Sequence, residues 1–347
     1  MINRRRFTRL SLALTAMPFM STYLPSSVNY PAKRTIKASR LKRGDTIGLI
    51  TPGSYLSDSG IEKAIQNIES LGLKVKLGKH IRAERGFTAG TDAQRLSDLH
   101  TMFTDSQVSA VWCARGGYGC SRLLPTIDYK LIRRNPKLLL GYSDITALLN
   151  AIYARTGLIG FHAPVGASDF TTYTVEHLSQ LIFADTANYS IPVAAENLKE
   201  KNTSYHPKVI RSGIASGKLV GGNLSLIAAM VGSGYNINGK DRLVFLEDIG
   251  EKPYRIDRML TQLRQADYFK GATGILLGVF ADCEADEDDR SLTLHETLRD
   301  RLENLDIPIL YGFSFGHIDN QCTIPIGVRA TLNTETQRLT LLESVTN

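Results

Sequence analysis

The sequence is poor in cysteine, and none of its cysteines form the close pairs that zinc sites use. The four residues are Cys113, Cys120, Cys283 and Cys322, and no two of them are in C-x-x-C spacing. This spacing gives no support to a structural zinc site. The sequence allows a disulfide in an oxidising compartment but does not define which two cysteines would form it. We expect most of these cysteines to pack as small apolar side chains.

Acidic residues are missing from the first 43 positions, and this gap accounts for the positive charge of the chain. The formal net charge is +7, from 41 Lys and Arg against 34 Asp and Glu. Ten of the basic residues lie within 1–43, which leaves 31 bases against 34 acids in the remainder. Because the remainder has no excess of positive charge, nucleic-acid binding is not supported.

The N-terminal apolar run, from Leu10 to about Met20, is too short to span a bilayer. It follows the stretch NRRRFTR, in which Arg4, Arg5 and Phe7 resemble a twin-arginine export signal. No clean small-x-small cleavage site follows, so an uncleaved basic tail is the alternative. We predict export to the periplasm without a stable membrane span, and we assign residues 1–40 to a signal peptide and linker.

The sequence beyond residue 40 alternates between short buried strands and amphipathic helices. With 43% hydrophobic residues, the chain is long enough for one large or two medium cores. Strands are expected at 46–51, 73–78, 108–114, 137–141 and 158–164, and helices at 58–71, 94–103 and 143–155. This alternation predicts an N-terminal α/β domain over 41–170 with a parallel sheet, whose functional loops lie at the carboxyl ends of the strands.

The second half of the chain shows a different pattern. Periodicity weakens over 171–206, which we interpret as an interdomain connection. The segments LVFLED, GILLGVF and ATLNTETQRLTLLES then indicate short strands, and PYRIDRMLTQLRQA indicates a helix. We therefore expect a second, mixed domain rich in β structure over 207–347.

A serine at the end of a strand is the first candidate for chemistry. In KLLLGYSDITALLNAI, residues 137–152, Ser143 lies between an apolar run and an amphipathic one. A sharp strand-to-helix turn can expose a serine hydroxyl as a nucleophile, whereas the simpler alternative is a serine that caps a helix. The stretch GYSDI lacks the second glycine of the G-x-S-x-G motif, so it does not match the general α/β-hydrolase pattern.

An activated serine needs a base and an acid that orients the base. His317 follows a short apolar run and a glycine in FSFGH, and Glu247 lies beside Asp248 at the end of a strand. Strand alternation sends Glu247 and Asp248 to opposite sides, so only one of them can face a given cleft. His162, at the end of the strand over 158–164, is the rival base.

Two glycine-rich stretches and one acidic run are candidate ligand sites. ARGGYGCS offers Gly116, Gly117 and Gly119, but it is neither a P-loop nor a G-x-G-x-x-G motif, so a tight turn is the alternative to an anion site. VGGNLSLI opens a helix at Asn223. The acidic run over 282–289 lacks the glycine of a calcium loop, so we expect a solvated loop and no metal or other cofactor.

Six stretches, taken together and in order, carry a resemblance to a known family. They are AGTDAQRLSDLHTMF, WCARGGYG, LLLGYSDITAL, GGNLSLI, FLEDIGEKPYRIDRML and FSFGH. The chain resembles the LD-carboxypeptidases, a serine peptidase family that acts on murein tetrapeptides, from about Lys42 to about Leu342. The resemblance implies a flavodoxin-like N-terminal domain, a mostly β C-terminal domain, an active site between them, and a homodimer.

The resemblance also implies roles for particular residues. Ser143 would be the nucleophile, His317 the general base and then acid, and Glu247 the carboxylate that holds the imidazole. The N–H groups of Gly117 and Asp144 would form the oxyanion hole. The implied reaction removes the terminal D-alanine from a murein tetrapeptide by cleaving the L,D-peptide bond.

Substrate contacts and alternative functions are less defined by the sequence. Arg115 is a candidate for binding the free carboxylate of the substrate, and Asn223 is a candidate for another substrate contact. One alternative is hydrolysis of peptidyl nucleotides, as in microcin-immunity enzymes, although an export signal argues against it. A non-catalytic murein-binding protein is the other, and the presence of all three triad residues disfavours it.

Overall fold

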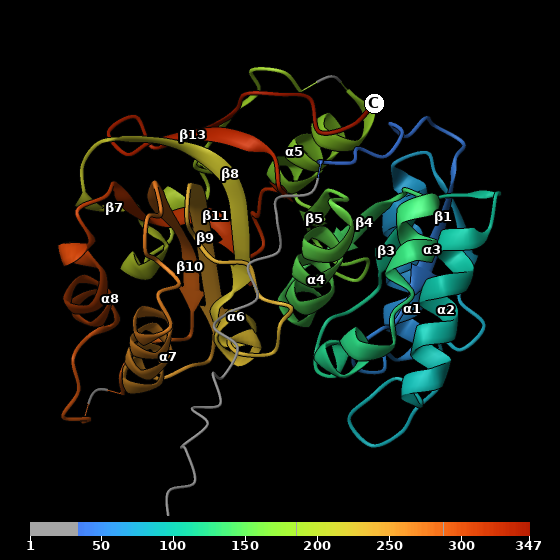
Figure 1. Cartoon of the computed structure of the whole chain (residues 1–347), viewed down its shortest axis with the longest axis horizontal. Coiled ribbons are helices and arrows are strands. Elements are labelled where there is room, and N and C mark those ends of the chain that lie inside the picture. Colours follow the sequence, from blue (N-terminus) through green and yellow to red (C-terminus); the bar gives the residue numbers. More distant parts are fainter. Residues whose placement is uncertain (1–33, 185, 287) are drawn as a thin grey trace, which may run out of the picture.

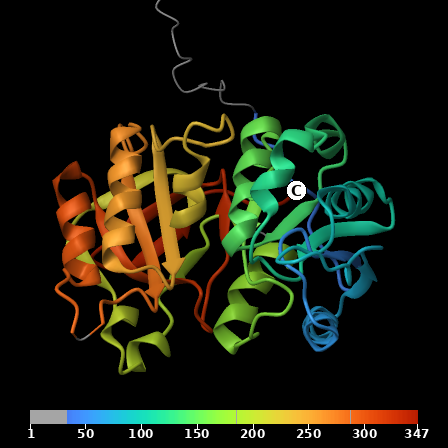
Figure 2. The ribbon, with the colours of Figure 1, turned by 90° about the horizontal axis from the view of Figure 1, so that it is seen from below.

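The computed structural model describes residues 34–184, 186–286 and 288–347 (Figure 1). The expected export signal lies almost entirely outside the described residues, so export stays a prediction. No helix in the described ranges is long and apolar enough to cross a membrane. The described chain forms two lobes, each built on its own sheet, which lie side by side in both ribbon views (Figures 1 and 2).

The first sheet has six strands in the order β12-β5-β4-β3-β1-β2. Starting from the β2 edge, the first five strands are β2-β1-β3-β4-β5, and all five are parallel. This is the flavodoxin-like strand order. The predicted parallel sheet is thus confirmed. Its strands are β1 (Thr46–Ile50), β2 (Lys74–Leu77), β3 (Val108–Cys113), β4 (Leu138–Gly141), β5 (Gly160–His162) and β12 (Ile324–Ile326).

Helices connect these strands, and side-chain caps mark where the helices begin. Ser57 caps α1 through its hydroxyl, and Thr91 forms a capping box with Gln94 at the start of α2. The strands β3 and β4 are apolar on both sides because the sheet is covered on both faces. The helices of this half are α1 (Asp58–Ser70), α2 (Asp92–Thr104), α3 (Tyr129–Arg134), α4 (Thr146–Thr156) and α5 (Thr172–Phe183).

The second sheet has eight strands in the order β6-β14-β13-β8-β9-β10-β11-β7. Its four strands β8 to β11 are parallel, and antiparallel strands flank them on both sides, so the predicted mixed domain is confirmed. The helices α7 and α8 pack side by side (Figure 2). The elements are β6 (Ser190–Pro192), β7 (Lys208–Arg211), β8 (Ile214–Asn223), α6 (Leu224–Met230), β9 (Arg242–Ile249), α7 (Pro253–Gln265), β10 (Gly274–Ala281), α8 (Leu294–Leu302), β11 (Ile309–Gly316), β13 (Arg329–Asn333) and β14 (Arg338–Leu341).

One stretch that was expected to form short strands is a hairpin. The segment 330–344 contains the antiparallel pair β13 and β14. The Asn333 side chain accepts hydrogen bonds from the N–H groups of Glu335 and Thr336, which closes the turn. The turn residues are polar but include no glycine or proline, so the sequence marks the reversal only weakly.

The two halves of the chain are joined more closely than two sequential domains would be. The strand β12 lies in the C-terminal half, yet it pairs with β5 at the edge of the first sheet. Between the halves, the predicted connection over 171–206 holds α5 and β6. At the start, the predicted boundary at residue 40 falls inside packed chain: Ile36 bridges to Leu158, and Ala38 is buried. That short segment has no periodicity from which its packing could be predicted.

The four cysteines pack as the sequence analysis expected. All are free thiols, and all are buried. Burial raises the pKa of Cys322 to about 12, so this thiol stays protonated and behaves as an apolar core group.

Candidate active site

The chain turns sharply at Ser143, directly after β4. Ser143 has φ +63°, in the left-handed region, and opens a single helical turn, Ser143–Ile145, that leads into α4. Holding a non-glycine residue in this region costs about 1–3 kcal/mol, and such strain is concentrated at functional sites. Ser143 is not the N-cap residue of this turn or of α4; those positions are Tyr142 and Ile145. The geometry is that of a nucleophile elbow and not of a capping serine.

A glycine-rich loop lies directly against this serine. A Cβ atom built on Gly116 would lie 3.2 Å from the Ser143 Oγ and 3.2 Å from the Asp144 backbone nitrogen. Gly117 has φ +90°, and a Cβ there would lie 2.4 Å from the Ser54 Oγ. Any larger residue at these two positions would therefore displace either the serine turn or the loop. The glycine loop thus packs directly against both the Ser143 side chain and the Asp144 backbone nitrogen.

Ser54, in the turn after β1, holds this loop in place. Its N–H donates to the Gly116 carbonyl (2.9 Å), and its Oγ accepts from the Tyr118 N–H (3.0 Å). The same hydroxyl donates to the Phe87 carbonyl (2.7 Å). One buried side chain therefore fixes two loops relative to the serine turn.

Glu247 and His317 form a hydrogen-bonded pair in the second lobe. Glu247 lies near the end of β9 and is fully buried, and His317 follows β11. The His317 Nδ1 lies 2.7 Å from the Glu247 Oε2. Because Nδ1 faces the carboxylate, the tautomer that donates there leaves Nε2 as the basic nitrogen.

Burial and charge act in opposite directions on this pair. Burial lowers the pKa of His317, but the charge of Glu247 and its hydrogen bond outweigh burial, so this pKa lies above its usual value of 6.5. Burial also raises the pKa of Glu247, and the charge and hydrogen bond of His317 bring that pKa below its usual value. Glu247 is therefore ionised at neutral pH, although it is out of contact with solvent.

Contacts between the lobes bring this pair to the serine turn. The Asn223 N–H, at the end of β8, donates to the Thr146 Oγ1 in the first turn of α4 (3.0 Å). Asn223 is also the register partner of Glu247 in the sheet. On the other side, the ring of Tyr142, the residue before Ser143, lies 4.8 Å from the His317 ring between centroids. The Glu247–His317 pair therefore lies beside the residues that flank Ser143, where β4, β8, β9 and β11 end.

Asp248 faces the other side of β9, as strand alternation requires. Its carboxylate accepts from the Asn223 side chain (2.9 Å) and from both the N–H and the hydroxyl of Ser225. Burial and the nearby Glu247 charge raise the pKa of Asp248 to about 6. Asp248 thus secures the start of α6.

His162, the rival base, lies in an apolar cage. It is fully buried, and neither ring nitrogen has a hydrogen-bond partner among the described residues. Its ring contacts those of Tyr142, Phe245 and Phe315, with centroids 5.5 to 5.9 Å away. Burial lowers the pKa of His162 to about 4, so it is neutral at physiological pH.

The two predicted substrate contacts lie at this edge of the sheets but have structural partners. Asn223 is buried, and its side chain caps α6 and donates to Asp248. Arg115 is exposed, and its guanidinium donates to the Tyr55 carbonyl (3.0 Å). Their predicted role in binding substrate stays a prediction.

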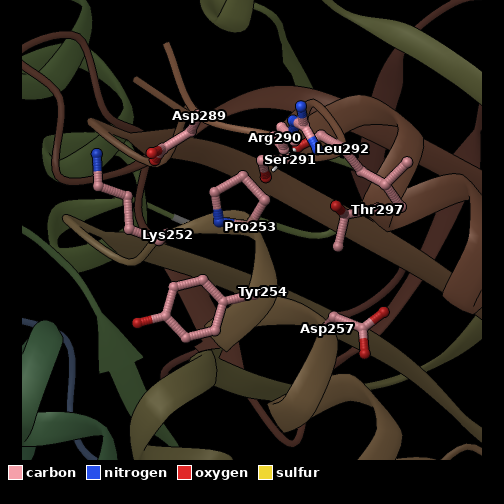
Figure 3. Close-up of a pocket in the computed structure, with 9 residues that line it drawn as sticks. All are labelled: Lys252, Pro253, Tyr254, Asp257, Asp289, Arg290, Ser291, Leu292 and Thr297. Atoms are coloured by element: carbon pink, nitrogen blue, oxygen red, sulfur yellow. Dashed lines mark hydrogen bonds between the residues drawn. The ribbon is translucent and has the colours of Figure 1, made fainter. Parts of the chain in front are cut away.

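A separate cavity lies beside the start of α7. Its volume is about 520 Å³, and Figure 3 shows Pro253 and Tyr254 on one side and Ser291 and Leu292 on another. None of the predicted site residues lines it. The Lys252 ammonium at its edge pairs with Asp286 of the acidic run (2.7 Å). Across the described ranges, no group of three His, Cys, Asp or Glu residues is placed to hold a metal ion.

Sequence reasoning did not identify three residues that shape this site. They are Ser54, which holds the glycine loop, Thr146, which docks the second lobe, and Tyr142, which contacts His317. Tyr142 and Thr146 flank Ser143 in the chain, so their position was a usable signal. Ser54 carries no comparable signal, because its role depends on a contact with a loop more than 60 residues away.

A doubly wound sheet with a strained serine turn, joined to a second sheet that carries a hydrogen-bonded Glu–His pair, defines a two-domain α/β protein of the serine hydrolase class. Family models agree: residues 47–163 match the LD-carboxypeptidase N-terminal domain, and residues 216–332 match the LD-carboxypeptidase C-terminal domain. The chain belongs to the LD-carboxypeptidase family.

Individual relatives support the same assignment. The chain is 40% identical to the probable murein peptide carboxypeptidase of Bacillus subtilis, over 89% of this chain and 93% of that protein. The solved MccF-like protein of Bacillus anthracis has a TM-score of 0.77 at 31% identity, covering 89% of this chain and 100% of that one. The solved muramoyltetrapeptide carboxypeptidase of Oxalobacter formigenes has a TM-score of 0.73 at 30% identity, covering 85% and 97%.

Proposed function

We propose that the protein is a serine carboxypeptidase that removes the terminal D-alanine from murein tetrapeptides by cleaving the L,D-peptide bond. The observation that most supports this function is the hydrogen-bonded Glu247–His317 pair, with Glu247 fully buried, beside the strained Ser143 turn. The family membership and the names of the relatives above support the choice of substrate.

In the proposed reaction, the Ser143 Oγ attacks the carbonyl carbon of the diamino acid while its proton passes to the His317 Nε2. The resulting oxyanion accepts hydrogen bonds from the N–H groups of Gly117 and Asp144. His317 then gives its proton to the departing amine of D-alanine as the C–N bond breaks. Glu247 stabilises the imidazolium that forms between these two steps.

Water completes the proposed cycle. It attacks the acyl-enzyme carbonyl while His317 accepts one of its protons, and the same proton returns to the Ser143 Oγ as the ester bond breaks. The products are a tripeptide and D-alanine. Arg115, at the exposed end of the glycine loop, is the proposed partner of the substrate's free carboxylate.

A direct test compares two bonds with one enzyme preparation. Purified protein is incubated with a murein tetrapeptide, which ends in an L,D-bond, and with a pentapeptide that ends in a D,D-bond. We expect D-alanine release from the tetrapeptide only, and none from the Ser143→Ala protein. Release from the pentapeptide at a comparable rate would contradict the specificity, and no release from either peptide would contradict the proposed activity.

We also propose that the protein acts in the periplasm and forms a homodimer. The stretch NRRRFTR supports export, and the family resemblance supports the dimer. Fractionation of cells that carry the wild type or an Arg4→Lys, Arg5→Lys variant tests export, and equal cytoplasmic retention of both would contradict it. Light scattering of the purified protein measures the mass, and a monomer of 38.3 kDa would contradict the dimer.

A further inference from the structure

Two buried side chains of opposite charge lie beside the glycine loop that carries Gly117. Asp144 is 2% exposed, and its Oδ2 accepts a hydrogen bond from the Cys120 N–H (2.9 Å). Arg95, in α2, is also 2% exposed, and its guanidinium donates to the Pro52 carbonyl in the turn after β1. The proposed reaction uses the backbone N–H of Asp144 but neither of these two side chains.

Both side chains contact the same two backbone segments. In the glycine loop, a Cβ atom built on Gly119 would lie 2.7 Å from the Arg95 Nη1, and the Asp144 carboxylate binds the next N–H along, that of Cys120. In the turn after β1, a Cβ atom built on Gly53 would lie 2.9 Å from the Asp144 Oδ2, directly after the carbonyl that Arg95 binds. The two charged groups therefore contact consecutive residues of each segment, which places them close to one another.

Arg95 carries positive charge that its ion pair compensates only in part. Its Nη2 lies 2.6 Å from the Asp92 Oδ1, but Asp92 also pairs with Arg122 through its Oδ2 (2.9 Å). One carboxylate thus faces two guanidinium groups. The Arg95 Nε has no hydrogen-bond partner among the described residues. Uncompensated positive charge therefore lies inside the protein, next to the glycine loop.

The Asp144 carboxylate needs such a positive charge nearby. Burial raises the pKa of Asp144, and the Cys120 N–H and the charge of Arg95 lower it, so that this pKa stays above its ordinary value. An ionised carboxylate here repels an oxyanion, because the backbone N–H of the same residue is one of the predicted oxyanion donors. The cation of Arg95 opposes this repulsion in a region that water screens poorly.

We propose that Arg95 and Asp144 are a pair of positioning residues for the oxyanion hole. The Asp144 carboxylate anchors the far end of the glycine loop, and the Arg95 cation offsets its negative charge where the oxyanion develops. The Ser54 hydroxyl holds the same loop at the Tyr118 N–H, so the loop is fixed at two places. This inference rests on the proposed function and adds to it two side chains that act on the transition state without touching the substrate.

The test compares kcat for a tetrapeptide in single and double variants. Arg95→Met keeps a long side chain but removes the charge, so the uncompensated Asp144 carboxylate should lower kcat by about tenfold, with KM little changed. Asp144→Asn removes the negative charge and keeps an oxygen that can accept from the Cys120 N–H. In the Arg95→Met, Asp144→Asn double variant, kcat should therefore be about threefold or more above that of Arg95→Met alone. If Arg95 only held the backbone in place, the second substitution would restore nothing.

Arg122→Met is the matched control. Arg122 shares the Asp92 carboxylate, but its side chain is 45% exposed, so its removal should leave kcat within about twofold of the wild type. Arg95→Lys keeps a cation and should retain more activity than Arg95→Met. Thermal unfolding midpoints of all variants distinguish a rescue of folding from a rescue of kcat. If Arg95→Met does not fold, Arg95→Gln, which keeps a donor for the Pro52 carbonyl, takes its place in the same comparison.

Phenylboronic acid measures the same effect without turnover, because a boronic acid forms a tetrahedral anion on a serine hydroxyl. Its Kd, from calorimetry, should rise in Arg95→Met and recover in the double variant by the same factors as kcat. Three results would overturn the proposal: a double variant no better than Arg95→Met, an equal loss in Arg122→Met, or a wild type that does not bind the boronic acid. A failure of the proposed cleavage is seen separately, as an uncleaved tetrapeptide while the boronic acid affinities still follow this pattern.

Discussion

The His317 Nδ1 lies 2.7 Å from the Glu247 Oε2, although the two residues are 70 positions apart in the chain. Glu247 is fully buried, and its second oxygen has no hydrogen-bond partner among the described residues. The imidazole is therefore the group that this carboxylate holds by a hydrogen bond. A buried carboxylate used in this way fixes the tautomer of His317 and turns Nε2 towards the reaction.

The first prediction concerns the triad as a unit. Ser143→Ala and His317→Ala should each lower kcat by several orders of magnitude, and the double variant should be no worse, because triad members act together. Glu247→Ala should be milder. Steady-state rates with a tetrapeptide substrate measure this. A His317→Ala enzyme that keeps more than about a tenth of the wild-type kcat would contradict the assignment, since general-base catalysis contributes about 10²- to 10⁴-fold.

The second prediction concerns pH. The pKa of His317 lies above 6.5, and the base must be neutral to accept the serine proton, so kcat/KM should fall as pH drops through a value above 6.5. Glu247→Gln removes the charge that raises this pKa and leaves burial, which lowers it. In this variant, the acidic limb of the pH profile, where kcat/KM falls with decreasing pH, should therefore lie at lower pH than in the wild type. The maximal rate should also be lower. If the acidic limb of the Glu247→Gln variant lies at the same pH as that of the wild type, a group other than His317 controls this limb.

The third prediction separates His162 from His317. With a pKa of about 4, His162 is already neutral across the range in which the acidic limb should appear. Replacing it with phenylalanine preserves the aromatic contacts to Tyr142 and Phe245. We expect His162→Phe to keep kcat within about tenfold of the wild type and to leave the limb in place. A loss as large as that of His317→Ala would make His162 the base.

The fourth prediction concerns metal ions. The proposed mechanism uses only side chains and backbone N–H groups, so chelation with EDTA should leave kcat unchanged. Activity is measured before and after chelation and again after divalent cations are restored. A large loss that the cations reverse would direct attention to the acidic run near Lys252 and Asp286.

Local patterns in the sequence predicted much of this fold and part of the site. The strand ends that carry Ser143 and Glu247 follow buried apolar runs, and alternation along β9 separates Glu247 from Asp248. Contacts between distant segments have no local signal. The pairing of β12 with β5 and the docking of Asn223 on Thr146 are two such contacts. Each depends on how the two lobes fold onto one another.

The last prediction tests such a distant contact. Ser54→Ala removes the hydroxyl that accepts from the Tyr118 N–H and donates to the Phe87 carbonyl, so the loop that carries Gly117 should lose its fixed position. An oxyanion-hole donor contributes about 10²- to 10³-fold, and a displaced one should lose part of this, so we expect kcat to fall about tenfold with KM little changed. A boronic acid analogue of the tetrahedral intermediate should bind more weakly by the same factor. Ser57→Ala, which removes the hydroxyl cap of α1 three residues further on, is the control and should change stability and not kcat. If Ser54→Ala raises KM and leaves kcat and boronate binding intact, Ser54 does not position the oxyanion loop.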